Sequence, residues 1–163
     1  MRERLALAFV RVGNCFIKLN FMKIHLKLSF LFLLTASVAG AQGICPTGWH
    51  IATKTEWDTL TALATSMRPA ETGKVLKEAG AIHWQSANGI SGTDDLGFAA
   101  LGAGQRGSTY YSGFSEFQQQ GEFWTSTQYS TYTWMYYFLY NNDGYAYTQM
   151  PRSYGFSVRC VKD

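Results

Sequence analysis

The stretch that decides the fold of this chain is Cys45-Pro-Thr-Gly-Trp-His-Ile-Ala-Thr-Lys-Thr-Glu-Trp57. Residues 48–52 have the composition of a short strand. Residues 53–56 match a capping box, in which the Thr53 hydroxyl accepts from the Glu56 backbone N–H and the Glu56 carboxylate reaches back. Apolar residues at positions 57, 60, 64 and 67 lie on one helical face. The sequence therefore predicts a helix over residues 54–67, which ends before Pro69.

The first 41 residues are typical of a targeting segment rather than of a domain. Residues 22–27 form a short basic region, and residues 28–38 form an apolar run too short for a membrane-spanning helix of about 20 residues. Ala39-Gly40-Ala41 is a small-residue cleavage pattern. This order predicts a signal peptide over 22–41, cleaved after Ala41. An uncleaved N-terminal anchor is the alternative.

Residues 1–21 are expected to be an upstream extension or the product of a mis-assigned start, because a signal peptide opening at Met1 would be too long. Met22 is then the true start, and residues 42–163 form a single secreted, periplasmic or cell-surface domain. No membrane span is expected in this mature chain.

Charge argues against a nucleic-acid partner. Residues 1–41 hold six of the 14 basic residues and one of the 11 acidic residues. The mature chain therefore carries eight basic and ten acidic residues, a net charge of −2. No basic patch remains that would contact phosphates, so nucleic-acid binding is not expected.

Two of the three cysteines, Cys45 and Cys160, lie near the two ends of the mature chain. In an oxidising compartment they are expected to form a disulfide that pins the first strand to the last. Two buried free thiols are the alternative.

The rest of the chain predicts one more helix and then strands. A second helix fits residues 72–79, and residues 98–101 fit a short buried strand. Strands are predicted over 121–127, 133–140, 145–150 and 155–161, with Asn142-Asp143-Gly144 as a hairpin turn. Helices early and strands late, without a βαβ repeat, indicate an α+β domain.

Several motifs occur together in the order seen in one family. They are Cys45 to His50, Thr53 to Trp57, Gly73-Lys74, Leu76 to Glu78, His83-Trp84, Phe123 to Thr127 and Tyr154 to Cys160. The chain resembles the Fibrobacter succinogenes major paralogous domain family, which is similar to the formylglycine-generating enzymes and their C-type lectin-like fold. The resemblance implies a C-type lectin-like fold with two N-terminal helices, a small twisted antiparallel sheet and long loops. Ala52 departs from the pattern, because relatives carry proline there.

The resemblance does not imply catalytic residues in this chain. Formylglycine-generating enzymes use an active-site cysteine pair that binds copper, and this mature chain has no cysteine to spare if Cys45 and Cys160 are bridged. The Glu-Pro-Asn and Trp-Asn-Asp runs of calcium-dependent lectins do not occur. Asp94-Asp95 and residues 141–143 supply oxygen ligands suited to a hard cation, but polar turn residues are the commoner explanation. We therefore expect no enzyme activity, no catalytic residue, no metal site and no cofactor.

Aromatic residues are the remaining functional signal, since the mature chain holds five Trp, ten Tyr and six Phe in 122 residues. Trp49, Trp57, Trp124 and Trp134 are expected in the core. The predicted ligand-binding residues lie in or beside polar loops: Arg106, Tyr110, Tyr111, Tyr129, Tyr132, Tyr145 and Tyr147. Tyrosine gives rigid contact area with a polar tip. The sequence thus predicts a non-catalytic binding module for a polysaccharide or a cell-surface protein. The alternatives are a self-associating envelope protein, a diverged enzyme, and rings that only pack between loops.

Overall fold

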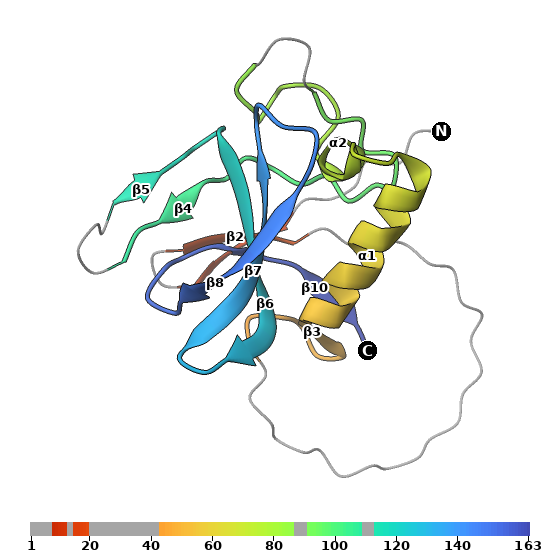
Figure 1. The fold of residues 1–163 in the computed structure, drawn as a ribbon. Helices are drawn as coiled ribbons and strands as arrows, with labels where there is room; N and C mark the ends of the chain where they lie inside the picture. The colour runs from red at the N-terminus through yellow and green to blue at the C-terminus, as the bar shows by residue number, and fades with distance from the viewer. Residues whose placement is uncertain (1–7, 13–14, 20–42, 87–90, 109–112) are drawn as a thin grey trace.

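The structure is a computed structural model that describes residues 8–12, 15–19, 43–86, 91–108 and 113–163. The predicted signal peptide over 22–41 and its cleavage after Ala41 lie outside the described residues and stay predictions. Within the described residues the chain forms ten strands and two helices, α1 (Lys54–Met67) and α2 (Thr72–Leu76) (Figure 1). No helix among these residues is long and apolar enough to cross a membrane.

The predicted α+β class with two N-terminal helices is wrong, because strands provide most of the regular structure. α1 has the predicted bounds and the predicted capping box between Thr53 and Glu56. α2 has only five residues, against the eight predicted over 72–79. It ends because Lys77 is extended and the Glu78 N–H donates to the Ala100 carbonyl at 2.9 Å. Residues 98–101, predicted as a strand, contribute only an isolated bridge between Ala100 and Lys77.

The main sheet has four strands in the order β8 (Ala146–Pro151), β7 (Tyr132–Leu139), β6 (Gln120–Tyr129) and β9 (Ser157–Val158). β7 runs antiparallel to both neighbours, and β9 pairs with β6 in parallel. β7 is therefore a central strand of this sheet. β8 lies at one edge of this sheet and β9 at the other.

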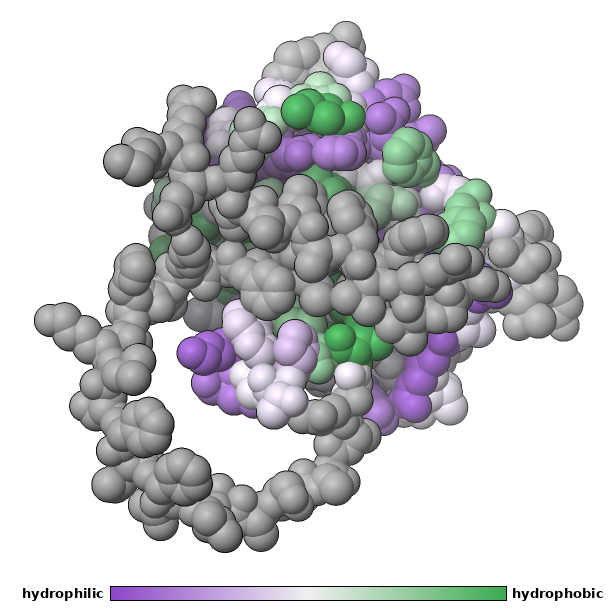
Figure 2. All heavy atoms as spheres, turned by 180° about the vertical axis from the view of Figure 1, so that it is seen from behind, coloured by the Kyte–Doolittle hydropathy of each residue, from purple (hydrophilic) through white to green (hydrophobic). Residues whose placement is uncertain are grey.

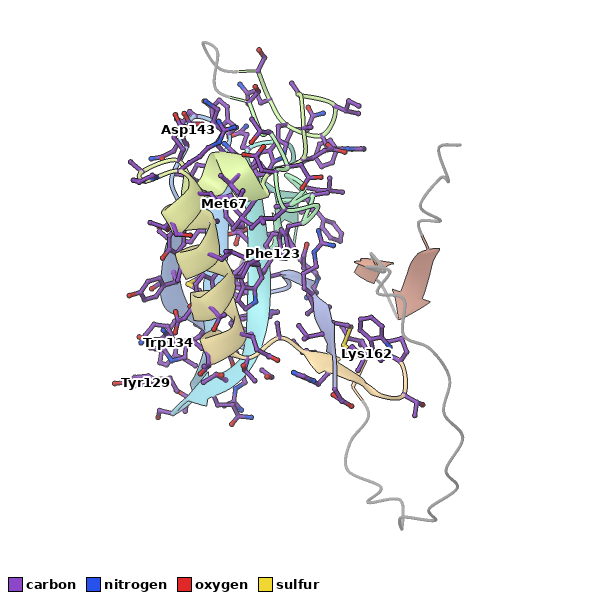
Figure 3. All side chains as sticks on the ribbon, turned by 90° about the vertical axis from the view of Figure 1, so that its right-hand side faces the viewer. Met67, Phe123, Tyr129, Trp134, Asp143 and Lys162 are labelled. Atoms are coloured by element: carbon purple, nitrogen blue, oxygen red, sulfur yellow. A yellow bond between two sulfur atoms is a disulfide. The ribbon has the colours of Figure 1, made fainter. Side chains whose placement is uncertain are left out.

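The core lies between α1 and one face of this sheet. Trp57 of α1 is 1% exposed and stacks on Tyr136 of β7, with ring centroids 5.0 Å apart. Phe123 and Phe138 pack against the same indole at 5.5 and 6.4 Å. α1 therefore covers the β6 and β7 part of the face, with Phe123 behind the helix in Figure 3.

The two ends of the domain meet in a separate pair of strands. β3 (Trp49–Ile51) and β10 (Cys160–Lys162) pair antiparallel, with Cys160 opposite Ile51. The predicted disulfide between Cys45 and Cys160 is confirmed. His50 on β3 adds a hydrogen bond from its imidazole to the carboxylate of Asp163, at 2.6 Å. The first and last segments of the domain are thus joined by strand pairing, by a side-chain contact and by a covalent bond.

Two further strand pairs complete the described chain. β4 (Gln105–Arg106) and β5 (Phe114–Ser115) form a short pair that projects on the side away from α1 (Figure 1). β1 (Ala8–Val12) and β2 (Cys15–Leu19) pair antiparallel as a separate two-stranded sheet. From behind, hydrophobic and hydrophilic residues lie side by side where coloured atoms are visible (Figure 2).

Candidate functional site

An aromatic row runs along the part of the sheet that α1 leaves open. Its members are Tyr129 at the end of β6, Trp134 of β7, Tyr147 of β8 and Tyr145 just before β8. Ring centroids are 5.8 Å apart between Tyr129 and Trp134, 5.9 Å between Trp134 and Tyr147, and 6.5 Å between Tyr147 and Tyr145. These separations are those of favourable aromatic pairs. Tyr129 and Tyr147 are 56% and 48% exposed, and the other two rings are half-buried.

The aromatic row is continuous with the core. Tyr136 is fully buried beneath the row, and its ring lies 5.4 Å from that of Tyr147. The same ring stacks on Trp57 on one side and on Tyr145 on the other, at interplanar angles of 11° and 10°. The surface rings therefore rest on a packed aromatic layer, which restricts their orientations.

Two charged residues on α1 support the row from the helix side. The Lys54 ammonium lies 5.2 Å from the Trp134 ring centroid and 4.8 Å from that of Tyr147. Such distances permit cation–π attraction to both rings. Asp58, four residues along the helix, accepts hydrogen bonds from the Lys54 ammonium at 2.8 Å and from the Tyr136 hydroxyl. The helix cap that begins α1 thus also places Lys54 against the row.

The hydrogen bonds of Asp58 decide its charge. Burial alone would raise the pKa of Asp58, but the bonds from Lys54 and Tyr136 outweigh burial and lower it. Burial, reinforced by the contact with Asp58, raises the pKa of Tyr136 above its ordinary value. At neutral pH Asp58 is therefore ionised and pairs with the Lys54 ammonium, while the Tyr136 phenol is neutral.

Tyr132 lies at the end of the hairpin that carries Tyr129. The two residues are opposite each other in the β6–β7 register, and Tyr132 is exposed. Arg152 fixes this turn, because its guanidinium donates to the Gln128 side chain at 2.9 Å and to the Ser130 carbonyl at 3.0 Å. Figure 3 shows Tyr129 and Trp134 at this end of the sheet, beside the first turn of α1.

The structure brings together only part of the predicted ligand-binding set. Tyr129, Tyr145 and Tyr147 belong to the aromatic row, and Tyr132 adjoins it. Arg106 is elsewhere, because it pairs with Gly155 next to β9, at the edge of the sheet opposite β8. Arg106 therefore does not share one surface with the aromatic row, and its predicted role in ligand binding stays a prediction. Tyr110 and Tyr111 lie outside the described residues.

A shallow cavity of about 150 Å³ adjoins the β7–β8 turn. It is lined by Tyr137, Leu139, Asn142, Gly144, Tyr145 and Ala146. Because side chains alternate along a strand, Tyr137 and Leu139 lie on the face opposite Tyr136. The cavity is therefore separated from the aromatic row by the sheet, and only Tyr145 belongs to both.

Several side-chain oxygens of the oxygen-rich loops form structural bonds, although Oδ1 of Asp143 is buried without a hydrogen-bond partner among the described residues. Asp94 accepts the Ala99 backbone N–H at 2.6 Å, and Asp95 forms an ion pair with Arg68 at 2.8 Å. The Asn142 side chain accepts the Gly144 N–H at 2.6 Å, as expected of a turn. Across the described ranges, no three His, Cys, Asp or Glu side chains gather in a way that would hold a metal ion.

Two titratable groups outside the row are perturbed. His50 contacts both Asp163 and Glu56, and these hydrogen bonds raise the pKa of His50 despite partial burial. Glu122 is buried on β6, and one of its carboxylate oxygens has no hydrogen-bond partner within the described chain. Burial, with the nearby charge of Glu116, raises the pKa of Glu122 to about 7.

Sequence reasoning missed three members of the site. Trp134 was expected in the core, yet it is half-buried and joins Tyr129 to Tyr147. Lys54 and Asp58 read only as polar residues on a helix. The alternation of Tyr132, Trp134 and Tyr136 along a strand predicts that they share one face, but it does not predict that Trp134 is exposed there. The contacts of Lys54 depend on how the helix packs, which no local pattern reveals.

These features define a β-rich domain with disulfide-joined ends and an exposed row of aromatic rings. The model of the Fibrobacter succinogenes major domain matches residues 26–162, and the chain belongs to this family. The match begins within the segment predicted as a signal peptide. No curated protein and no solved structure matches the chain. A relation to formylglycine-generating enzymes or to C-type lectin-like proteins is therefore not shown.

Proposed function

We propose that the chain is a non-catalytic binding module, secreted or exposed at the cell surface, whose aromatic row binds a polysaccharide. The observation that carries this proposal is the contiguity of Tyr129, Trp134 and Tyr147, with two of the three rings half exposed. Contiguous exposed apolar surface marks interaction sites in soluble proteins. Sugar rings present C–H faces that pack on aromatic faces and hydroxyls that bond to polar tips.

The polar groups around the row suit the same ligand. Lys54 and Asp58 bring donors and acceptors beside the rings. Gln149 stands opposite Trp134 in the β7–β8 register and adds an amide at the same level. A small number of polar groups around an apolar surface is the usual composition of a small-molecule site. The disulfide supports export, because such bonds persist in oxidising compartments.

A glycan array probed with the purified protein tests the proposal. The Trp134→Ala/Tyr147→Ala variant should lose binding, because it removes the two central rings. Phe117→Ala is the matched control, since Phe117 is 67% exposed but follows β5, away from the row. A folded protein that binds no glycan, or a double variant that binds as well as the parent, contradicts the proposal.

Self-association in the cell envelope is a second candidate function. Phe114 and Phe117, at and after β5, are 70% and 67% exposed, which is unusual for large apolar side chains. Light scattering at high concentration tests this candidate with the Phe114→Ser/Phe117→Ser variant. A parent that stays monomeric throughout argues against it.

A diverged enzyme of the formylglycine-generating group is the remaining alternative. Cys45 and Cys160 are bonded to each other, so neither is a thiol that would bind copper. Thiol titration of the native protein, together with copper analysis, distinguishes this alternative from a binding module. Free thiols at both positions with bound copper would favour the enzyme.

A further inference from the structure

Resting on the proposed function, we propose that the aromatic row selects a single soluble glycan chain and rejects the flat face of an insoluble polymer. The inference comes from the orientations of the rings rather than from their number. A flat polymer surface contacts several rings at once only if their planes are parallel and level. A single chain can rotate about its glycosidic bonds and follow rings whose planes differ.

The ring planes of the row turn sharply from one member to the next. The interplanar angle is 66° between Tyr129 and Trp134, and 54° between Trp134 and Tyr147. It is 30° between Tyr147 and Tyr145. No flat surface can therefore lie face-on against both Trp134 and either of its neighbours.

These orientations follow from the sheet. Tyr129, Trp134 and Tyr147 come from three adjacent strands, so the row crosses the sheet diagonally. Because adjacent strands of a twisted sheet are rotated relative to one another, the side chains of the row are rotated as well. The β6 strand adds a register irregularity between Trp124 and Gln128, just before Tyr129. Bulges of this kind increase the local twist and redirect side chains.

The rings are also held in these orientations. Tyr136 packs beneath Tyr147, and the Lys54 ammonium lies over both Trp134 and Tyr147. Lys54 is itself fixed by its ion pair with Asp58 at 2.8 Å. Flattening the row would break these contacts, so a flat ligand would have to supply the free energy of that rearrangement.

The test compares matched pairs of the same sugar in soluble and insoluble form. The probes are microcrystalline cellulose with cellohexaose, powdered chitin with chitohexaose, and curdlan with laminarin. Calorimetry measures binding to each soluble chain, and depletion from solution measures binding to each powder. We expect at least one soluble chain to bind about tenfold or more tightly than the matching powder, per binding site.

The outcomes separate this inference from the function on which it rests. A soluble-chain preference below about tenfold in every bound pair, or tighter binding to the powder, overturns the inference but leaves the binding module standing. Absence of binding to every probe overturns both. The Trp134→Ala/Tyr147→Ala variant should lose soluble-chain binding, while Phe117→Ala keeps it. Soluble-chain binding that survives in the double variant places the site elsewhere and overturns the inference.

Discussion

Replacing Cys45 and Cys160 with alanine removes the covalent link between the two ends of the domain. The bond spans a sequence separation of 115 residues, so it restricts the unfolded chain strongly. Loop entropy for a closure of this size corresponds to roughly 4–5 kcal/mol of stability at 25 °C. A domain of this length has a total free energy of unfolding of about 5–15 kcal/mol. The variant is therefore expected to lose a large part of its stability.

The non-covalent contacts at the same place are too few to replace the bond. β3 and β10 share only three residue pairs, and the contact between His50 and Asp163 is exposed to solvent. Exposed pairs of this kind contribute about 0–1 kcal/mol. In the double variant the two ends should therefore separate before the rest of the domain unfolds. Otherwise the whole domain should unfold at a lower urea concentration than the parent does.

Urea unfolding followed by tryptophan fluorescence measures the loss. The parent, the Cys45→Ala/Cys160→Ala variant and the Cys45→Ala variant are compared, and the two variants should agree because either one breaks the bond. A loss below about 1 kcal/mol with an unchanged urea dependence would refute the reasoning. It would mean that the unfolded chain is already compact without the bond.

Three other substitutions test single contacts. Lys77→Met should lower the free energy of unfolding by about 2–3 kcal/mol, because the buried ammonium donates to two carbonyls of the β7–β8 turn at 2.8 and 3.1 Å; an unchanged melting temperature would contradict this. Gly73→Ala should cost about 1–3 kcal/mol, since the added Cβ would lie 1.9 Å from the Gly144 carbonyl oxygen, and a stable variant would show that α2 can shift. Glu122→Gln should stabilise the protein above pH 7 by at most about 3 kcal/mol. The folded pKa of Glu122 is raised to about 7 from 4.5, so the parent loses stability as pH rises between these values. Equal pH profiles of unfolding for parent and variant would count against a buried Glu122.

Local sequence motifs were enough to predict the elements that begin at a helix cap or at a characteristic turn. The capping box at Thr53 and Glu56 located the start of α1, and the Asn142-Asp143-Gly144 turn located the β7–β8 hairpin. α2 was predicted three residues too long because its end depends on tertiary pairing. Lys77 and Glu78 are good helix formers, but the Glu78 N–H donates to the Ala100 carbonyl. The Ala100 N–H donates in turn to the Leu76 carbonyl, so this pairing overrides their helical preference.

The candidate site was predictable only in part, for a related reason. Exposed tyrosines beside turns, such as Tyr129 and Tyr147, can be picked out from composition. Trp134 could not, because an aromatic residue on a central strand is equally typical of a core. The exposure of Trp134 depends on β8 being an edge strand and on α1 leaving this part of the sheet open. Arg106 was grouped with the tyrosines by nearness in sequence, whereas the sheet places it at the opposite edge.

An NMR titration with a bound soluble glycan tests the central claim, that the aromatic row is the binding surface. The indole N–H signals of the tryptophans are assigned by substitution and followed to saturation. We predict that the Trp134 signal shifts while that of Trp57, which is buried in the core, stays in place. Shifts confined to residues around Arg106 and Phe114, or no shift at a saturating concentration of the glycan, would contradict the claim.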